Sequence, residues 1–300
     1  DIPVLITGET GTGKELVARA LHYGGGRREK PFVAVNCASL PKDLVQSELF
    51  GYEKGAFTGA HASKGGAFDE AEDGTIFLDE IGDMDLPAQA ALLHVLETGE
   101  YRSVGGGVKR TCARVLVATN HDLEALVRGA RFRKDLFYRV NRMRVEIPPV
   151  RLRKEDIPLL ARHFLERIEA RVAKGVGDIA SDAMEALVRY GWPGNVRELR
   201  NEIERAYIHA QGRITALDLS PMVTSWNGIA DEQGTPDPSS LEDLHRLVDA
   251  LKSTGGNVSR AAEALGVHRN TVHRWMRRFG LGSPGRGRGG DASSKESREA

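Results

Sequence analysis

Residues 2–7 read IPVLIT and residues 8–15 read GETGTGKE, and this join between an apolar run and a glycine-rich segment decides the fold. Apolar side chains then recur with helical spacing from Lys14 to His22, so the stretch predicts a strand, a glycine loop and a helix. A glycine loop in that context is typical of phosphate binding, because its backbone N–H groups converge at the start of the helix. The lysine would reach the β- and γ-phosphate oxygens of a nucleotide.

The glycine loop departs from the general phosphate-loop pattern at one position. Glu15 stands where that pattern has the Ser or Thr that binds Mg²⁺, so another residue must account for the metal. The residues predicted to bind the nucleotide are Gly8, Glu9, Thr10, Gly11, Thr12, Gly13, Lys14 and Glu15. The helical face predicted to be buried carries Leu16, Val17, Ala20 and Leu21.

Four further apolar runs follow, at residues 32–37, 75–78, 114–119 and 143–147, and the segments between them are long enough for helices. The runs are apolar throughout rather than alternating, which indicates strands that are buried on both faces. The sequence therefore predicts an α/β domain over residues 1–150, with a parallel sheet covered by helices on both sides.

Two acidic residues, Asp79 and Glu80, follow the apolar strand at residues 75–78. Open parallel sheets bind ligands at the carboxyl ends of their strands, so these acids should face the nucleotide. We expect Asp79 to bind Mg²⁺ and Glu80 to orient and polarise the attacking water. Such a pair alone commonly just begins a solvated loop, but its place after a phosphate loop favours the catalytic interpretation.

Other polar residues end neighbouring strands: Asn36 ends the second, and Thr119 with Asn120 ends the fourth. A lone Asn at a strand end usually satisfies nearby backbone groups, but the sheet geometry predicts that all three residues face the nucleotide crevice. Arg133 and Arg139 are either ordinary surface charges or the arginines that stabilise charge on the γ-phosphate in a neighbouring subunit's site.

The stretch GYEKGAFTGA at residues 51–60 shows neither helical nor strand periodicity, and it has glycine at both hinge points. It predicts a mobile loop with Phe57 at its tip, suited to contact a partner. The alternative is a glycine-rich connector whose Phe57 enters the core. The segment expected to make the contact consists of Gly55, Ala56, Phe57, Thr58, Gly59 and Ala60.

Beyond Pro149 the pattern becomes helical. Residues 151–225 predict a small helical domain, and residues 226–240, rich in polar and turn-forming residues, predict a linker. Residues 241–281 predict a compact all-α domain. The tail at residues 282–300 has almost nothing to bury and is expected to be disordered.

The segment 241–281 has the pattern of a helix-turn-helix, in which Asn257 caps one helix, Gly266 makes the turn and a basic second helix follows. Arg and Asn on that second helix suit base edges and phosphates, although a merely solvated basic face is the alternative. The preceding helix, from Leu241 to Leu251, would either pair two such domains or cover its own bundle. The residues predicted to contact DNA are Arg269, Asn270, His273, Arg274, Arg277 and Arg278.

Charge, cysteine content and hydropathy limit the function classes. Lys and Arg together number 42, as do Asp and Glu, so only a local cluster could attract a polyanion. Neither Cys37 nor Cys112 belongs to a metal-site spacing, which favours a reducing compartment. No apolar run reaches the roughly 20 residues of a membrane span, and residues 1–25 lack the features of a signal peptide. We therefore expect a cytoplasmic protein without a membrane partner.

Five motifs stand in order along the chain: GETGTGKE, ELFGYEKGAFTGA, GTIFLDEIGDM, FRKDLFYRV and WPGNVREL. With them, residues 1–222 resemble the AAA+ ATPase domain of sigma-54-dependent transcriptional activators, the NtrC-like bacterial enhancer-binding proteins. That family also places Glu after the phosphate-loop lysine, so the resemblance explains Glu15. The C-terminal segment resembles the Fis-type helix-turn-helix with which the same family ends. Family members carry further residues and usually a regulatory domain before the first strand, so we expect that this chain is either a fragment or numbered without its N-terminal part.

The resemblance implies ATP and Mg²⁺ as cofactors and a role for each matching residue. Lys14 matches the phosphate-binding lysine, whereas Asp79 and Glu80 match the metal-binding and catalytic acids. Asn36 matches the residue thought to hold the catalytic glutamate in a switchable hydrogen bond. Residues 119–120 match the γ-phosphate sensor.

Further matches concern neighbouring subunits and the target. Arg133 and Arg139 match the trans-acting arginine fingers, and Arg197 matches the sensor arginine of the helical lid. Residues 55–60 match the loop that engages sigma-54 itself. The segment from about residue 98 to 107 matches a second pore-side loop that moves with the first.

We therefore predict an ATP-hydrolysing activator that binds upstream (enhancer) DNA as a dimer, assembles into a ring-shaped hexamer or heptamer, and remodels the sigma-54 RNA polymerase closed complex. One rival is a DNA-binding regulator whose ATPase fold is only a scaffold, but it would not need Lys14 and Glu80. Another is an AAA+ remodeller of a different target, which would not need Phe57 and Thr58.

Overall fold

The computed structural model describes residues 2–57, 60–226, 241–254 and 257–265, together with residues 272, 275 and 276. The chain divides into two compact units, Asp1–Ser225 and Trp226–Ala300. Among the described residues, no helix combines the length and the apolar composition needed to cross a membrane.

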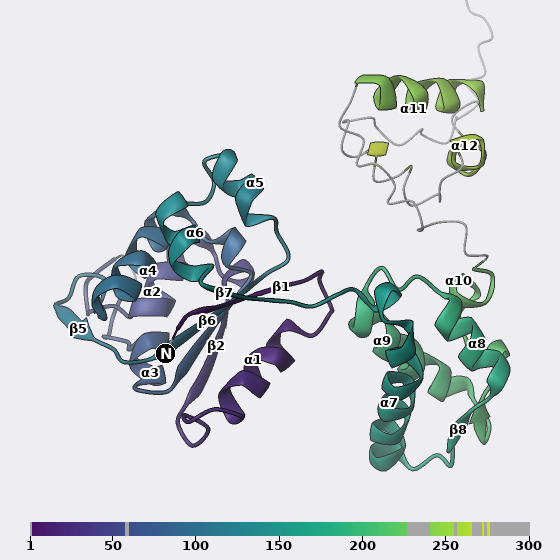
Figure 1. Ribbon diagram of the computed structural model, residues 1–300, viewed down its shortest axis with the longest axis horizontal. Coiled ribbons are helices and arrows are strands. Elements are labelled where there is room, and N and C mark those ends of the chain that lie inside the picture. The colour runs from purple at the N-terminus through teal and green to yellow at the C-terminus, as the bar shows by residue number, and fades with distance from the viewer. Residues whose placement is uncertain are drawn as a thin grey trace, which may run out of the picture. The chain divides into compact units, whose positions relative to one another are not determined.

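Five parallel strands form the central sheet of the first unit, in the spatial order β2, β3, β6, β1, β7 (Figure 1). Because the strands are parallel, their carboxyl ends lie at one edge of the sheet. The α/β class with a parallel sheet is therefore confirmed, and each strand end lies within two residues of its predicted place. The bounds are Val4–Thr7 for β1, Phe32–Asn36 for β2, Thr75–Asp79 for β3, Arg114–Thr119 for β6 and Met143–Glu146 for β7.

Helices cover both faces of this sheet, and the predicted burial of both faces is confirmed for the central strands β1, β3 and β6. It is wrong for the edge strands β2 and β7, which are half-buried or exposed because each has a neighbouring strand on one side only. On one face, Ala18 of α1 (Lys14–Tyr23) packs in a core with Ile6 and Leu116. On the other face, Val117 belongs to a larger core that takes side chains from α2 to α6. The bounds of these helices are Lys42–Phe50 for α2, Ala67–Ala71 for α3, Leu86–Thr98 for α4, Leu123–Arg128 for α5 and Lys134–Val140 for α6.

The buried face of α1 differs from the predicted one. Lys14, Ala18 and His22 are buried, whereas Leu16 and Ala20 are exposed. The buried residues are spaced four apart and therefore lie along one side of the helix. The prediction from apolar spacing is confirmed for Val17 and Leu21, which are half-buried and pack against the core, and it is wrong for Leu16 and Ala20, because the lysine of the glycine loop begins the buried side.

Two short strands, β4 (Glu100–Arg102) and β5 (Val108–Arg110), form an antiparallel hairpin separate from the main sheet. Tyr52 joins this region through isolated β-bridges to Lys64 and to Val104. The GYEKGAFTGA loop therefore begins beside the hairpin.

A helical lid completes the first unit and is connected to β7 by the short 3₁₀ helices η3 (Val150–Leu152) and η4 (Lys154–Asp156). Its core contains Trp192, which is fully buried and donates its Nε1–H to the carbonyl oxygen of Leu187 at 2.8 Å. The lid elements are α7 (Ile157–Val172), β8 (Asp178–Ile179), α8 (Ser181–Arg189), α9 (Asn195–His209), β9 (Arg213–Ile214), η5 (Ala216–Asp218) and α10 (Pro221–Thr224).

The described part of the second unit contains α11 (Leu241–Ser253) and α12 (Val258–Leu265). Leu247 of α11 is fully buried and packs in one core with Ala262. At least at Leu247, the apolar face of α11 therefore covers its own bundle, which was one of its two alternatives. All six residues predicted to contact DNA, and the tail at residues 282–300, lie outside the described residues, so those contacts stay predictions.

Candidate functional site

The glycine loop passes from β1 to α1 with two glycines in left-handed backbone, Gly11 at φ 83° and Gly13 at φ 102°. Any other residue would be strained there. Lys14, which begins α1, is only 6% exposed. Its Nζ donates to the carbonyl oxygen of Gly8 at 3.1 Å and to Oε1 of Glu80 at 3.2 Å. The loop thus holds its lysine against the end of β3.

Glu80 links the glycine loop to the end of β6. Its backbone is left-handed, with φ 53°, a conformation that is rare outside glycine and that clusters at functional sites. One carboxylate oxygen contacts Lys14, and the other accepts the backbone N–H of Asn120 at 2.9 Å. Lys14 lies 66 positions before Glu80 in the sequence and Asn120 lies 40 positions after it, and both meet at this carboxylate.

Asp79 lies half-buried at the end of β3, and its Oδ1 accepts the N–H of Glu80 at 3.1 Å. Burial raises the pKa of the Asp79 carboxyl, and the negative charge of Glu80 raises it further. A divalent cation bound here would neutralise the two negative charges and so offset the cost of burying them. The two acids therefore fit Mg²⁺. Among the described residues, no cluster of three or more His, Cys, Asp or Glu could hold a metal by itself. Phosphate oxygens and water would have to complete the shell.

Thr119 and Asn120 stand at the end of β6, opposite the glycine loop. The Asn120 side chain donates its Nδ2–H to Oγ1 of Thr10 at 2.8 Å. Thr119 is fully buried, and its Oγ1 accepts the N–H of His121 at 3.0 Å. Asn120 therefore contacts Glu80 through its backbone and the glycine loop through its side chain, as a residue that senses the γ-phosphate would need to do.

Asn36 ends β2 directly beside Asp79 in the sheet register. Its Oδ1 accepts the backbone N–H groups of Ala38 at 3.0 Å and of Ser39 at 3.1 Å. Asn36 and Glu80 both lie in the described part of the chain, and no hydrogen bond joins them. The Asn36 oxygen instead accepts hydrogen bonds from the turn that follows it. The switchable contact implied by the family resemblance stays a prediction.

Arg133 directly precedes α6 and Arg139 lies in its last turn, and neither lines the cavity that contains Lys14. Arg133 forms an exposed pair with Asp135, with Nε–Oδ1 at 3.0 Å and Nη2–Oδ2 at 2.7 Å. Arg139 donates its Nε–H to the carbonyl oxygen of Leu96 at 3.1 Å. The action of both arginines on a neighbouring subunit's nucleotide stays a prediction.

Two acidic side chains of residues 8–15 are paired with arginines. Glu15 pairs with Arg19 one turn along α1, with Oε1–Nη2 at 2.7 Å, and it also lines the cavity that contains Lys14. Glu9 receives a two-pronged contact from Arg151 of η3, with Nη2–Oε1 at 2.6 Å and Nη1–Oε2 at 2.8 Å. Neither carboxylate is therefore an uncompensated negative charge beside the glycine loop.

Further lid residues hold the outside of the glycine loop. Asn195, the first residue of α9, donates its Nδ2–H to Oε2 of Glu9 at 3.0 Å, and Arg153 donates to the carbonyl oxygen of Thr12 at 3.1 Å. Reasoning from the sequence missed these contacts and the one from Arg151, because no local pattern marks a partner that lies in another subdomain.

A cavity of about 330 Å³ opens between the glycine loop, the two acids Asp79 and Glu80, and the lid. Its arginines and Lys14 suit the phosphates of a nucleotide, and its apolar members suit an uncharged part. The exposure of Leu16 is explained by its place here. The lining residues outside the loop and the acids are Leu16, Phe164, Arg167, Val196, Arg197 and Arg200.

Of these lining residues, the sequence pointed only to Arg197. Arg200 follows it by three positions on α9 and therefore lies on the same side of that helix, a signal that was available. Arg167 lies on α7, and nothing in its sequence context indicated a site.

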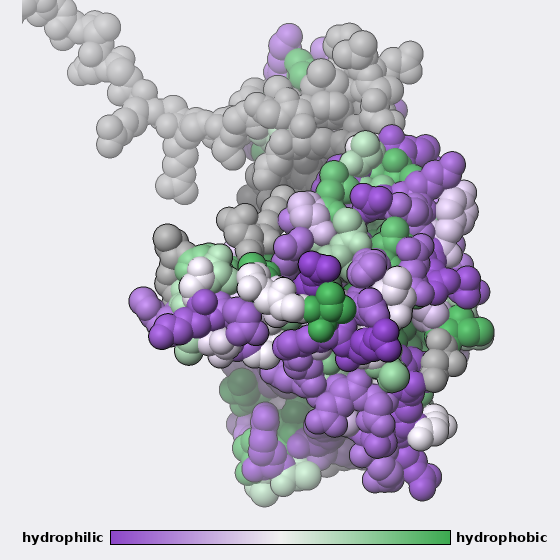
Figure 2. Space-filling model, turned by 90° about the vertical axis from the view of Figure 1, so that its left-hand side faces the viewer, coloured by the Kyte–Doolittle hydropathy of each residue, from purple (hydrophilic) through white to green (hydrophobic). Residues whose placement is uncertain are grey.

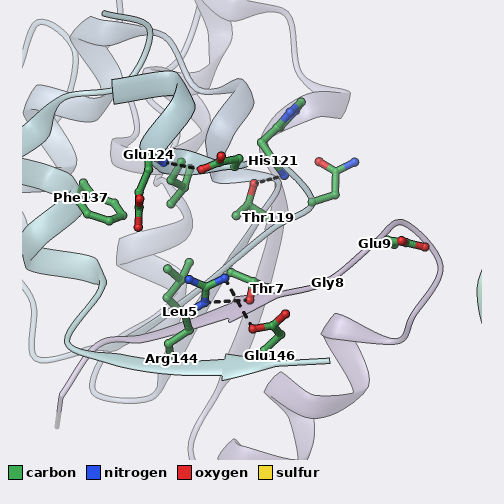
Figure 3. A pocket seen from close by; sticks show the side chains of 13 residues that line it. Leu5, Thr7, Gly8, Glu9, Thr119, His121, Glu124, Phe137, Arg144 and Glu146 are labelled. Atoms are coloured by element: carbon green, nitrogen blue, oxygen red, sulfur yellow. Dashed lines mark hydrogen bonds and ion pairs between the residues drawn. The ribbon is translucent and has the colours of Figure 1, made fainter. Parts of the chain in front are cut away.

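A second cavity, of about 240 Å³, lies between the sheet and helices α5 and α6 (Figure 3). Thr7 and Arg144 project from β1 and β7 on one side of it, and Glu124 and Phe137 line the other side. Arg144 donates its Nε–H to Oγ1 of Thr7 at 3.2 Å. This cavity contains neither the loop lysine nor the two acids, so the cavity beside the lid is the better nucleotide candidate.

The contact segment, residues 55–60, starts at Gly55 with φ 82°. The Gly55 N–H donates to the carbonyl oxygen of Ala60 at 2.9 Å, which closes the segment into a tight loop. The Phe57 ring is 40% exposed, and its centroid lies 5.0 Å from that of Tyr52. The alternative in which Phe57 enters the core is therefore wrong. Thr58 and Gly59 lie outside the described part of the chain.

The face that carries β5 is largely hydrophilic, with small separate hydrophobic spots (Figure 2). Phe57 is an exposed aromatic residue whose ring is paired with that of Tyr52. A single exposed aromatic residue suits a small, specific contact rather than a broad apolar interface.

The base of the GYEKGAFTGA loop is bound to the turn of the β4–β5 hairpin. The N–H of Val104 donates to the carbonyl oxygen of Gly51 at 2.9 Å, and the N–H of Glu53 donates back to the carbonyl oxygen of Val104 at 3.0 Å. The turn of the hairpin is thereby held against the base of the GYEKGAFTGA loop.

A polar cluster around Asp69 of α3 reinforces that base. Asp69 Oδ1 accepts a hydrogen bond from the Tyr101 hydroxyl at 2.9 Å and from Lys109 Nζ at 2.8 Å, and its Oδ2 accepts the N–H of Gly66 at 2.9 Å. Burial alone would raise the pKa of Asp69, but the bonds from Lys109, Gly66 and Tyr101 outweigh it and hold that pKa below its usual value. The carboxylate therefore ties both strands of the hairpin to α3.

Three family models match the chain. Residues 1–146 match the sigma-54 interaction domain, residues 151–234 match the AAA+ ATPase lid domain, and residues 242–279 match the bacterial regulatory protein Fis family. Together the three matches follow the order of domains that the sequence motifs predicted.

Curated relatives agree with these matches. The DNA-binding transcriptional regulator NtrC of Azospirillum brasilense is 44% identical over 92% of the chain and 64% of its own length. The transcriptional regulatory protein ZraR of Escherichia coli is 45% identical over 90% of the chain and 62% of its own length. The chain therefore spans a little less than two thirds of each of these relatives.

A solved structure extends the likeness to three dimensions. NtrX from Brucella abortus, crystallised in complex with ADP, aligns with a TM-score of 0.70 and 33% identity. The alignment covers 93% of the chain and 65% of the NtrX chain. The fold of the chain is thus similar to that of NtrX, a protein crystallised with a bound nucleotide.

Proposed function

The chain belongs to the family of sigma-54-dependent transcriptional activators, and from that premise we propose that it couples ATP hydrolysis to remodelling of the sigma-54 RNA polymerase closed complex. The observation that carries the proposal is the meeting of Lys14 and Asn120 at the carboxylate of Glu80. Hydrolysis of a γ-phosphate needs a cation on the phosphate, a carboxylate on the water and a group that senses the phosphate. These three residues are suited to those tasks.

The residues would act in sequence on the nucleotide. Lys14 is paired with Glu80 at 3.2 Å. On binding, the lysine would turn to the β- and γ-oxygens, and the freed Glu80 carboxylate would orient and polarise water. Asp79 would hold Mg²⁺, which supplies charge neutralisation at the phosphates. Thr119 and Asn120 would report whether the γ-phosphate is present.

Three arginines complete the proposed site. Arg197 lines the cavity from the lid and would contact the phosphates within the same subunit. Arg133 and Arg139 lie outside their own subunit's cavity, which supports a ring in which each site is completed by its neighbour. The basic segment at residues 269–278 supports binding to upstream DNA through the helix-turn-helix.

The output of the cycle would be the contact segment at residues 55–60. The chain that follows the segment leads through α3 to β3, which ends at Asp79, next to Glu80. A change at those acids would therefore reach the segment through a single short stretch of chain. The exposed ring of Phe57 is the part that we expect sigma-54 to bind.

The test is binding of purified chain to sigma-54 in the presence of ADP with a γ-phosphate transition-state analogue. We expect binding with the analogue and none without it. Thr58→Ala should keep ATPase activity but lose binding and transcriptional activation. Glu80→Gln should bind ATP while turnover falls by about 10²- to 10⁴-fold, the usual loss when a general base is removed.

Two outcomes would contradict the proposal. ATPase activity that stays at background even at high protein concentration would favour the scaffold alternative. Normal activation by Thr58→Ala in a sigma-54 transcription assay would show that the segment at residues 55–60 is not the output.

A further inference from the structure

Glu9 places a carboxylate in the loop where phosphates would bind, and like charges at such a site repel. The structure resolves this conflict by pairing the carboxylate with Arg151 in a two-pronged contact of 2.6 and 2.8 Å. The hydrogen bonds from Arg151 are the main reason that the pKa of Glu9 lies below its usual value, although burial opposes them. Glu9 therefore stays ionised at neutral pH, and its charge is directed to the lid.

Asn195 joins the same contact from α9. It is fully buried, and its φ of 53° is a strained conformation for a residue other than glycine. Its Nδ2 donates to Glu9 at 3.0 Å and to the carbonyl oxygen of Thr10 at 3.1 Å, while its Oδ1 accepts the N–H of Val150 at 2.9 Å. One side chain thus ties together the glycine loop, the connection from β7 and the start of α9.

The backbones of the loop and the lid also touch at this point. A Cβ on Gly11 would lie 2.3 Å from the carbonyl oxygen of Gly194, and the N–H of Arg197 donates to the carbonyl oxygen of Gly11 at 3.2 Å. Arg197 follows Asn195 by two residues and lines the nucleotide cavity. The place from which its side chain enters that cavity is therefore set by the contacts of Asn195 and Glu9.

We propose that Glu9, Arg151 and Asn195 are positioning residues that hold Arg197 at the nucleotide cavity and so couple the setting of the lid to the glycine loop. Glu9 acts through the lid and does not itself contact phosphate. The inference rests on the proposed nucleotide site. It differs from a merely structural role, because breaking the network weakens nucleotide binding only as long as Arg197 is present to be misplaced.

The experiment is a double-mutant cycle on the full chain, with Kd for a fluorescent ADP analogue as the readout. Glu9→Gln keeps the shape of the side chain and removes its charge. We expect Glu9→Gln and Arg197→Ala each to raise Kd by about five- to twentyfold, and the double variant to bind about as weakly as Arg197→Ala alone, because coupled residues are not additive.

A matched control is Glu48→Gln, which removes a carboxylate that does not line the nucleotide cavity. The two oxygens of Glu48 lie 2.8 and 2.9 Å from Lys64 Nζ. Its Kd should equal that of the wild type. Two further variants protect the test against misfolding of Glu9→Gln. Asn195→Gly keeps the left-handed backbone but deletes the side chain, and Arg151→Lys keeps the charge but loses the two-pronged geometry. Both variants should raise Kd, and the increase should be smaller for Arg151→Lys than for Asn195→Gly.

Additive losses in the double variant, or an unchanged Kd in Glu9→Gln that folds as the wild type does, would overturn the network. If the wild-type chain itself fails to bind the ADP analogue, the proposed function is contradicted instead. The two failures are therefore told apart by the wild-type titration alone.

Discussion

Two glycine-rich loops of this chain each contain a glycine with nearly the same φ angle, but the surroundings of these two glycines are opposite. Gly11 in the phosphate-binding loop has φ 83°, and Gly55 in the contact segment has φ 82°. A Cβ at Gly11 would lie 2.3 Å from the carbonyl oxygen of Gly194, whereas a Cβ at Gly55 would have no heavy atom within 4 Å beyond its chain neighbours. One loop is enclosed by the lid, and the other is open to a partner.

The difference shows that glycine has two roles in this chain, one in close packing and one in allowing a left-handed backbone angle. An anion site works only when its N–H groups are held in place, so the first loop needs glycine for close packing as well as for its backbone angle. A contact loop must reach outward, so the second needs glycine for the angle alone. Its firmness comes instead from its base, where Asp69 joins α3 to the hairpin.

We expect the largest loss of stability and of nucleotide binding from Gly11→Ala, which tests directly whether the first loop is enclosed. Left-handed backbone costs a residue with a Cβ about 1 to 2 kcal/mol, and at Gly11 the collision with Gly194 adds to that cost. Gly55→Ala is the matched variant and should show the backbone cost only. Thermal unfolding and nucleotide titration measure both, and equal losses in the two variants would contradict the enclosure of the first loop.

Asp69→Asn should come next. Hydrogen bonds to a charged group contribute about 1.5 to 3 kcal/mol, so we expect a loss of that order in the free energy of unfolding, together with weaker sigma-54 binding and an unchanged Kd for ADP. Denaturant unfolding gives the first quantity. Asp73→Asn, which removes an exposed pair with Lys30 at 2.9 Å, is the control and should change little. If Asp69→Asn raised the Kd for ADP, the two loops would not be anchored separately.

Phe57→Ala tests the open tip. Its ring pairs with Tyr52, and such aromatic pairs contribute about 0.5 to 1.5 kcal/mol, so the loss of stability should be small. We expect ATPase activity to be kept and activation to be lost, as measured in parallel by phosphate release and by sigma-54-dependent transcription. Activation that survives this change would mean that the exposed ring is not the contact.

The smallest effect concerns the enclosed loop in acid. The folded-state pKa of Glu9 lies below the ordinary value of about 4.3 for a free Glu. Its contribution to stability is therefore present above that ordinary value and is lost as the pH falls through the folded-state pKa. Wild type should exceed Glu9→Gln in unfolding temperature at neutral pH, and the gap should close in acid. A gap that is the same at every pH would contradict the role of the charge.

Much of the fold and part of the site follow from the sequence, for identifiable reasons. A strand such as residues 114–119 is apolar throughout because both of its faces are buried, and this leaves a readable pattern. Asp79, Glu80 and Asn120 are found from the sequence because parallel strands bring their carboxyl ends to one edge. The oxygen of Asn36 accepts hydrogen bonds from its own turn, a choice of partner that no sequence pattern reveals, and its contact with Glu80 stays a prediction.

The sequence by itself determined the order of elements, the parallel sheet, the phosphate-binding loop and the glycine-rich contact segment, because each depends on local spacing of apolar, glycine and acidic residues. Tertiary structure alone decided that Glu9 meets Arg151, 142 positions away, and that Leu16 faces a cavity rather than the core. Those outcomes depend on how the lid packs on the sheet. Packing of that kind joins surfaces whose residues carry no shared periodicity, so only the folded chain brings them together.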